Sequence, residues 1–349
     1  MSYWPDRSLI IVTLYSLFIG ALGAGLAYWL SFPFYILTGP AILVSVLSMT
    51  GTRFAISDVV RDAALLFIGI GIGSGLNAGA TAAFLRWPLA FLALLVMLVA
   101  ILLFSRFLLT RFFQFDPRSA ILAATPGHLS FVLSMSAELD LNVARIAAVQ
   151  SVRLLALTLL VPFIAVAFGV KIDSTILPPG VPMDNAQLAV LLAVSIGFGL
   201  ILKRLRVPAP LLLGGLVVSS LAHLTEITTG TLLPEIALTS FLVLGTMIGA
   251  RFSGVALSQL KQAVIAGLAI TGVAALMAII GALSVAAFVE MPVAHVVVAF
   301  APGGLETMVA MGVMLGANPG FIVACHIARL LVLSMLVPLF LGRQGKSPA

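Results

Sequence analysis

The chain has 349 residues, of which 62% are hydrophobic and only 9% are charged, and its mean hydropathy is +1.23. A soluble domain carries about 25% charged residues, so this composition predicts a protein embedded in a membrane. The longest polar stretch, about 169–186, is too short for a separate soluble domain. The net charge of +6 is spread over many loops, which is typical of a topology signal and not of a nucleic-acid surface.

Apolar runs follow one another along the chain, many of them close to the roughly 20 residues that cross a bilayer. In the first half they fall at 8–30, 35–50, 62–80, 88–110, 119–138 and 143–168. In the second half they fall at 187–202, 208–224, 236–252, 262–289, 296–315 and 320–341. This order divides the chain into repeat 1 (1–170), a polar, proline-rich linker (171–186) and repeat 2 (187–349).

The fifth and sixth runs of each half carry the same pattern. TPGHL at 125–129 returns 176 residues later as APGGL at 301–305, and the match continues without a gap to the Arg-Leu-Leu that begins at Arg153 and at Arg329. Proline removes a backbone donor and glycine destabilises a helix, so the helical hydrogen-bond ladder breaks inside each fifth run. In a membrane protein, a repeated unit with a helix break and a buried arginine is typical of transporters.

Basic residues indicate how the runs cross the membrane, because lysine and arginine gather on the cytoplasmic side. Arg53 follows the second run and Arg251 follows the ninth. If every run spans and the N-terminus is cytoplasmic, these two residues lie on opposite sides. If 119–138 and 296–315 each enter and leave on one side, both residues and both termini are cytoplasmic and the linker is external. We prefer this second arrangement, and two kinked full-length helices are the alternative.

The sequence therefore predicts an all-α integral membrane protein with about ten transmembrane helices in two inverted repeats. Each repeat contains a Pro-Gly broken or re-entrant helix. The fragments beside each break have about ten residues and are too short to span alone. Broken backbone at this depth is tolerated only where protein or a wet cavity satisfies it, so we expect both breaks in the interior.

Arg153 and Arg329 are the strongest functional candidates, since each lies about ten residues into an apolar run, near the midplane of a ~30 Å core. A buried guanidinium is costly unless it is paired, so such residues mark transport pathways or ligand sites by default. The alternative is that each arginine caps backbone carbonyls of the broken segment beside it. The two roles are compatible.

The half-helices that begin after the breaks would point free N–H groups into the interior, which favours an anion. Ser130 and Glu306 occupy equivalent positions there, and Glu306 would pair with an arginine, bind a coupling cation, carry a proton, or merely complement the helix dipole. The candidate substrate-binding residues are Thr125, Pro126, Gly127, His128, Ser130, Arg153, Pro302, Gly303, Gly304, Glu306 and Arg329, with Asn142, Gln150, Asn318 and His326 in supporting positions.

We expect no metal, cofactor or catalytic residue. His128 and His326 lie at non-equivalent positions of the two repeats, and the single cysteine, Cys325, lies in an apolar run. Copper or iron oxygenase chemistry needs several histidine or carboxylate ligands around one centre, and the four histidines show no such spacing. Interior histidines that only form hydrogen bonds are the simpler interpretation. A basic recognition helix that would bind nucleic acid is also lacking.

The duplicated Pro-Gly…Asn…Arg-Leu-Leu units resemble the AbrB duplication family of bacterial membrane proteins, whose members carry labels such as ammonia monooxygenase or AbrB regulator. The family is distantly similar to inverted-repeat secondary transporters with broken helices. This resemblance implies a multi-pass protein of the bacterial inner membrane and an elevator-type transporter that forms a homodimer.

We therefore expect secondary transport of a small, anionic solute through a midplane site between the two Pro-Gly segments, together with a coupled proton or cation. The main alternative is a non-transporting membrane regulator or sensor that keeps the carrier fold. A membrane monooxygenase is the third interpretation. Transport predicts a wet midplane cavity, regulation predicts a sealed core with a partner surface, and an oxygenase predicts bound metal.

Overall fold

A computed structural model describes residues 7–74, 87–127, 129–169, 181–228, 230–253 and 257–341. Within these ranges the chain is helical, and the prediction of an all-α fold is confirmed. The helices of the first half are α1 (Arg7–Trp29), α2 (Tyr35–Met49), α3 (Asp58–Gly73), α4 (Trp87–Phe112), α5 (Pro117–Ala124), α6 (Leu129–Glu138) and α7 (Val143–Ala167). Those of the second half are α8 (Asn185–Arg204), α9 (Pro210–Leu224), α10 (Pro234–Ala250), α11 (Leu257–Val289), α12 (Val293–Phe300), α13 (Leu305–Met314) and α14 (Pro319–Leu341).

Each predicted Pro-Gly run is two short helices. The run 119–138 is divided between α5 and α6, and the run 296–315 is divided between α12 and α13. The two halves therefore have the same order of long and short helices. The repeat boundaries and the external position of the linker remain predictions.

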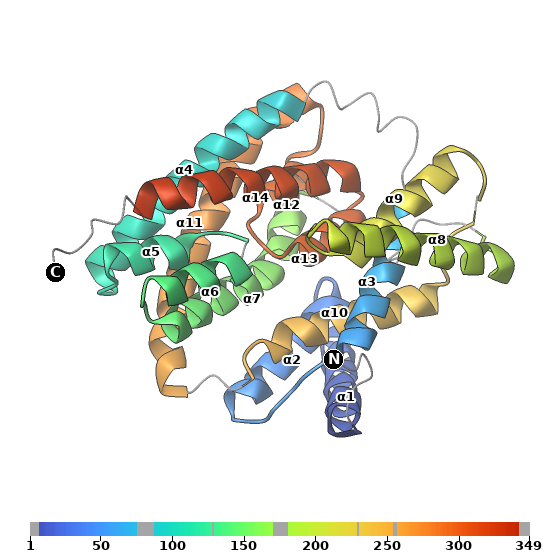
Figure 1. Ribbon diagram of the computed structural model, residues 1–349, viewed down its shortest axis with the longest axis horizontal. Coiled ribbons are helices and arrows are strands. Elements are labelled where there is room, and N and C mark those ends of the chain that lie inside the picture. Colours follow the sequence, from blue (N-terminus) through green and yellow to red (C-terminus); the bar gives the residue numbers. More distant parts are fainter. Residues whose placement is uncertain are drawn as a thin grey trace.

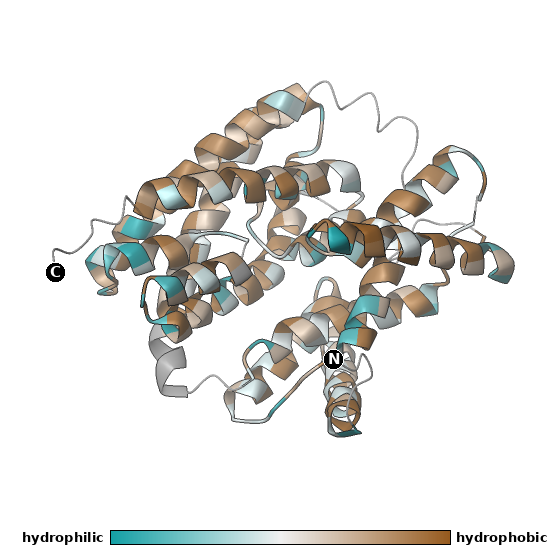
Figure 2. Ribbon diagram, viewed as in Figure 1, coloured by the Kyte–Doolittle hydropathy of each residue, from teal (hydrophilic) through white to brown (hydrophobic). Residues whose placement is uncertain are grey.

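Side-chain caps fix where several helices begin. The carboxylate of Asp116 accepts hydrogen bonds from the backbone N–H groups of Arg118 and Ser119, at 3.1 and 2.9 Å, and Pro117 occupies the first turn of α5. Proline suits this position because its missing N–H would have no helical partner there. Ser57 caps α3 and Asp184 caps α8 in a similar way. Polar residues therefore gather at helix starts, as the hydropathy colours show for α3 and α5 (Figure 2).

The helices form two groups that cut across the two halves of the sequence (Figure 1). The six-helix group contains α1–α3 and α8–α10, and the eight-helix group contains α4–α7 and α11–α14. Each half contributes three helices to the first group and four to the second. The main contacts between the groups are those of α7 with α2 and α10, and of α13 with α3. The second group contains both breaks and both predicted arginines.

Close backbone contacts define how α2 and α10 cross. A Cβ atom on Gly245 would collide with the carbonyl oxygen of Leu37, and one on Gly249 would lie 2.7 Å from Cβ of Val44. Glycine is required at these crossings because any side chain would push the two backbones apart. Since residue numbers increase in the same direction along both helices, α2 and α10 run parallel.

The pair α3 and α9 repeats this packing. Gly69 of α3 lies against the Leu212 carbonyl, and a Cβ atom on Gly73 would lie 2.6 Å from the carbonyl oxygen of Leu216. Ser219 then donates a hydrogen bond to the carbonyl of Ile70 at 2.8 Å. These two helices are therefore parallel as well, and the six-helix group has matching contacts from both halves.

The outward faces of the long helices are apolar. Six helices are long and apolar enough to cross a membrane, namely α1, α4, α7, α8, the 263–289 part of α11, and α14, and α2, α9, α10 and α13 are shorter apolar helices. Large side chains on these faces remain open to the surroundings, for example Ile11 of α1 (68% exposed) and Phe104 of α4 (56% exposed). Brown, hydrophobic residues cover most of the ribbon in Figure 2. These apolar helices are compatible with a multi-pass membrane protein.

Candidate functional site: two broken helices and their arginines

The first break lies between α5 and α6. Thr125 leaves the helical region with ψ 116°, as expected for a residue that precedes proline, and its hydroxyl donates to the carbonyl of Ile121 at 2.8 Å. Pro126 is buried, and Gly127 follows with φ +97°, a conformation that favours glycine. The helical ladder therefore stops at Ala124 and starts again at Leu129.

The second break has the same plan. Ala301 leaves the helix with ψ 125°, Pro302 is buried, and the backbone N–H of Gly303 donates to the carbonyl of Ala301 at 2.9 Å. Gly304 is the N-cap of α13 and has no side chain with which to cap it. Backbone N–H groups at the start of α13 are thus available for another acceptor.

Arg153 binds the carbonyl end of the helix before the first break. Its Nη1 atom donates to the carbonyls of Ala123 and Ala124 at 3.3 and 3.0 Å, and its Nη2 atom donates to that of Thr125 at 3.1 Å. Gln150, one turn earlier on α7, donates to the carbonyl of Leu122 at 2.8 Å. Arg153 is only 1% exposed, so the predicted burial and the carbonyl-capping role both hold.

Arg329 connects the two breaks. From α14, its Nη1 atom donates to the Ala301 carbonyl at 3.0 Å and its Nη2 atom donates to the Gly303 carbonyl at 3.1 Å. The same guanidinium lies against Gly127, where a Cβ atom would be 3.1 Å from both Nε and Nη2. Arg329 is 2% exposed. One side chain of the second half therefore touches both interruptions.

The interior at the breaks is positively charged. No carboxylate pairs with Arg153 or Arg329 in the part of the chain that the structure describes, and the two guanidinium groups are close enough to interact electrostatically. The carbonyl ends of α5 and α12 carry partial negative charge, while the starts of α6 and α13 carry partial positive charge. Two full positive charges are therefore offset mainly by carbonyl dipoles.

Three buried nitrogen atoms near the breaks have no hydrogen-bond partner among the described residues. They are Nε of Arg153, Nε of Arg329 and Nε2 of His326. His326 is 1% exposed and lies one turn before Arg329 on α14. Most buried polar atoms are paired, so each orphan atom needs an explanation such as a ligand or an ordered water.

Glu306 occupies the first turn of α13 and is partly exposed. Its Oε2 atom lies 3.4 Å from the position of a Cβ atom on Gly304, so the carboxylate turns back toward the start of its own helix. Within the described ranges it forms no ion pair. This placement is that of an acid that complements the positive end of a helix.

Asn142 and Asn318 lie away from the breaks. The side-chain oxygen of Asn142 accepts from the N–H of Arg145 at 3.0 Å at the start of α7, and that of Asn318 accepts from the N–H of Phe321 at 3.2 Å at the start of α14. Both are helix caps, a role for which asparagine before an apolar run is a recognised signal. His128 and the side chain of Ser130 lie outside the described parts of the chain.

Each broken pair folds back on itself as a hairpin. His295 near the start of α12 donates from Nε2 to the carbonyl of Leu315, which follows α13, at 3.0 Å. In the first half, Arg145 donates to the carbonyl of Phe113 at 2.7 Å, and its guanidinium carbon lies 3.8 Å from the centre of the Phe115 ring. The two hydrogen bonds were not predictable from the sequence, because their acceptors are backbone carbonyls and carry no residue signature.

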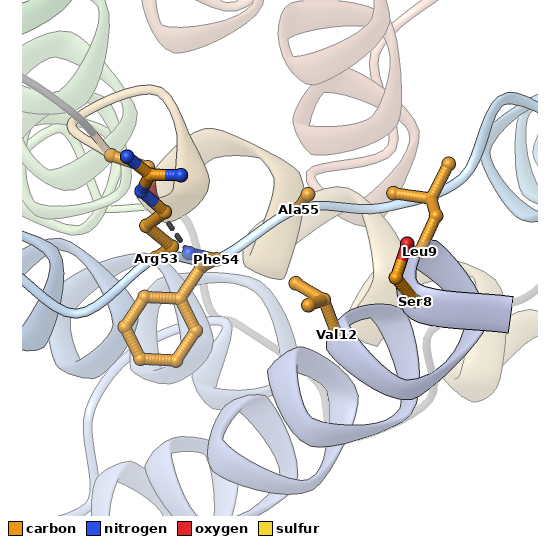
Figure 3. Close-up of a pocket in the computed structure, with 7 residues that line it drawn as sticks. Ser8, Leu9, Val12, Arg53, Phe54 and Ala55 are labelled. Carbon is orange, nitrogen blue, oxygen red and sulfur yellow. Dashed lines mark hydrogen bonds between the residues drawn. The ribbon is translucent and has the colours of Figure 1, made fainter. Parts of the chain in front are cut away.

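Three surface hollows lined by described residues lie elsewhere. One of about 370 Å³ is formed by the start of α1 and the loops that follow α2 and α10, with Arg53 and Ala55 on the connecting loop and Val12 on the helix (Figure 3). The other two are apolar grooves between α8 and α9 and between α4 and α11. In the described ranges, no group of three or more His, Cys, Asp or Glu residues could hold a metal ion.

A sequence model of one family matches residues 35–343, a span that contains both breaks and both arginines, and its description is "Transition state regulatory protein AbrB". The chain belongs to the AbrB family. One relative, "Uncharacterized protein YhjN" of Bacillus subtilis (strain 168), is 26% identical over 292 residues, which cover 79% of this chain and 76% of the relative. The predicted resemblance is therefore confirmed at the level of the family.

Proposed function

We propose that this chain is a secondary transporter of a small, anionic solute, whose site lies where the two breaks meet. The observation that carries the proposal is the position of Arg329, which donates to the break of its own half and lies against Gly127 of the other half. A guanidinium with an unpartnered Nε–H at such a junction is suited to bind an oxygen of an anion.

The electrostatics support an anion over a cation. Arg153 and Arg329 have no carboxylate partner among the described residues, and the starts of α6 and α13 add about half an elementary charge each. Glu306 supplies one negative charge. In a low-dielectric interior the remaining positive potential attracts a carboxylate, a phosphate or a similar group.

The packing supports two inverted repeats with ten spans. The backbone N–H of Phe54 donates to Oγ of Ser253 at 2.8 Å, so the loops after α2 and α10 lie on the same side. These are the loops of Arg53 and Arg251. If every predicted run spanned the membrane, those loops would lie on opposite sides. The parallel direction of α2 and α10 agrees with the inverted arrangement.

The hairpins support re-entrant segments. Since His295 of α12 contacts the residue that ends α13, the chain returns to the side from which it entered. The contact of Arg145 with Phe113 implies the same for α5 and α6. In this arrangement the α5–α6 hairpin opens to the cytoplasm and the α12–α13 hairpin opens to the outside.

The division into two groups suggests how the solute would move. Contacts between the six-helix and eight-helix groups involve few helices, and the breaks lie within the eight-helix group. Movement of this group against the other would expose the site first to one side and then to the other, as the resemblance to elevator-type carriers implies. We further propose a homodimer in the bacterial inner membrane, with cytoplasmic termini and no enzymatic activity.

The test combines binding with flux. Purified protein is screened by thermal shift against acetate, succinate, citrate and inorganic phosphate, with methylammonium as a cation, and proteoliposomes then report uptake of any stabilising anion. Arg329→Lys should abolish both signals, because a lysine lacks the guanidinium fork, whereas Arg111→Lys at the exposed end of α4 should preserve them. Stabilisation by methylammonium alone would overturn the anion assignment.

The family description names a regulatory protein, so a membrane sensor is the second candidate. A sensor would bind the anion with the same residues but would not carry it across the membrane. Anion-dependent stabilisation without uptake into proteoliposomes, measured in both orientations of the protein, would favour the sensor.

A further inference from the structure

His326 and Gln150 occupy equivalent positions in the two repeats, and their hydrogen bonds differ. The Gln150 amide donates to the carbonyl of Leu122 at 2.8 Å, one turn before the first break. His326 instead bonds within its own helix, through Nδ1 and the carbonyl of Ile322 at 3.0 Å. Its Nε2 atom has no partner in the described part of the chain. In the first repeat the side chain at this position therefore bonds to the helix before the break, whereas in the second repeat the corresponding nitrogen atom has no partner among the described residues.

The bond to Ile322 fixes the tautomer of the His326 ring. A carbonyl oxygen can only accept, so the hydrogen resides on Nδ1 and the neutral ring carries a lone pair on Nε2. Among the described residues this buried lone pair has no donor, and Arg329, one turn further along α14, also has an unpartnered atom. A neutral Nε2 would repel an anion at Arg329, whereas a protonated Nε2–H would donate to it.

We propose that His326 accepts the proton that enters together with the anion. The inference rests on the proposed transport function and assigns its coupling residue. A proton from water on the side of uptake adds to the Nε2 lone pair, which makes the ring positive and leaves Nδ1–H in place. An anion that bridges Arg329 Nε–H and His326 Nε2–H balances the new charge. On the other side the anion leaves and Nε2 returns its proton to water.

Other titratable groups near His326 are less suited to the role. On α14 itself they are Cys325, which is buried, and Arg329, whose charge acts on the ring. Of the helices that pack against α14, α12 carries His295, which is bonded to Leu315, and α13 carries Glu306, which is partly exposed. The helices α4 and α5 also pack against α14, and their charged residues are Arg106, Arg111 and Arg118.

An unpaired second positive charge beside Arg329 would be costly in this interior, which is why the proton and the anion should bind together. Neither would bind well alone. Anion affinity should therefore rise as pH falls, and each bound anion should bring about one proton with it.

Calorimetric titration measures the proton directly. Acetate, succinate and inorganic phosphate are titrated into the full-length protein in buffers of different ionisation enthalpy, and the dependence of the heat on the buffer gives the protons taken up. His326→Gln should fold, since glutamine already serves at position 150. It should bind the anion roughly ten-fold more weakly and without proton uptake. His223→Gln is the control, because His223 lies on α9, outside the eight-helix group, and its ring hydrogen-bonds to Ser219 and Gly230.

The outcomes separate this inference from the function on which it rests. Proton uptake that His326→Gln abolishes and His223→Gln preserves would support the assignment. Binding without proton uptake, or uptake that persists in His326→Gln, would overturn it and leave anion transport intact. If neither these three probes nor citrate binds the unmodified protein, both proposals fail.

Discussion

Gly127 of the first broken helix and Arg329 of the second half are in direct contact. A Cβ atom at position 127 would lie 3.1 Å from Nε and Nη2 of the guanidinium, and the backbone of Gly127 has φ +97°. Arg329 is held in this place by the carbonyls of Ala301 and Gly303. The repeated segments thus meet through a glycine without a side chain on one side and a fixed positive charge on the other.

Gly127→Ala should therefore impair both stability and transport. The positive φ alone costs roughly 1–3 kcal/mol for a residue with a side chain, and the new methyl group would displace Arg329. We expect a lower thermal unfolding temperature in detergent and loss of anion-dependent stabilisation. Gly272→Ala on α11 is the matched control, because nothing lies within 4 Å of the added methyl group. Equal unfolding temperatures for the two variants would contradict the contact.

Hydropathy and the Pro-Gly pairs were sufficient to predict the helical fold and the positions of both breaks, because proline and glycine act locally on the hydrogen-bond ladder. The grouping of helices was not predictable in this way. Parallel packing of α2 with α10 depends on glycine contacts such as Gly249 with Val44, far apart in sequence. Small residues are common in membrane helices, so their partners cannot be read from one chain.

The two arginines were predictable because a charge in the middle of an apolar run is rare. Their partners were not, since Arg153 and Arg329 bind backbone carbonyls, which every residue possesses. Asn142 and Asn318 were assigned supporting positions in the site, but the sequence already carried the capping signal that the structure shows. The unpartnered Nε2 of His326 was not predictable, because the sequence does not show which atoms hydrogen-bond to a buried ring.

The two arginines should differ in their response to substitution. Arg153→Lys keeps a donor for the carbonyls that end α5, so we expect a moderate loss of stability and retained anion binding. Arg329→Lys should lose anion binding, because it removes the unpartnered Nε–H that lies against Gly127, where the two breaks meet. For Arg153→Ala, the three carbonyls left without a donor would each cost about 1–3 kcal/mol. Thermal shift with and without succinate would distinguish these cases. Loss of anion binding in Arg153→Lys would assign both arginines to the solute.

Removal of either asparagine cap should lower the stability of the protein and should not affect transport. Asn142→Ala and Asn318→Ala each remove one hydrogen bond to a helix start, which costs about 1 kcal/mol. The unfolding temperature should fall slightly in both variants, and their affinity for the anion should equal that of the unmodified protein. A large decrease in affinity in either variant would place that residue in the site.

The Asp116 cap at the start of α5 makes the stability of the protein depend on pH. Burial would raise the pKa of its carboxyl, but hydrogen bonds from the Ser119 side chain and from the backbone N–H groups of Ser119 and Arg118 outweigh burial and hold the pKa below its ordinary value of 3.8. A carboxyl whose pKa is lowered on folding stabilises the protein above its unfolded pKa and loses this contribution as pH falls through its folded pKa. Unfolding temperatures measured between neutral and acid pH should therefore fall less steeply in Asp116→Asn. If the unfolding temperature depends on pH equally in both proteins, the charge of the Asp116 carboxylate does not contribute to stability.

The inverted arrangement makes a specific prediction about sidedness. Because Phe54 donates to Ser253, single cysteines at Arg53 and Arg251 should be labelled from the same face, and we expect this to be the cytoplasmic face. A cysteine at Asp184, the exposed cap of α8, should be labelled only from the other face. Cys325→Ser serves as the background, since Cys325 is the chain's single cysteine. Membrane-impermeant maleimide applied to intact cells and to inverted vesicles measures both faces. The inverted arrangement requires an odd number of spans between positions 53 and 184. Labelling of both positions from one face would therefore rule it out.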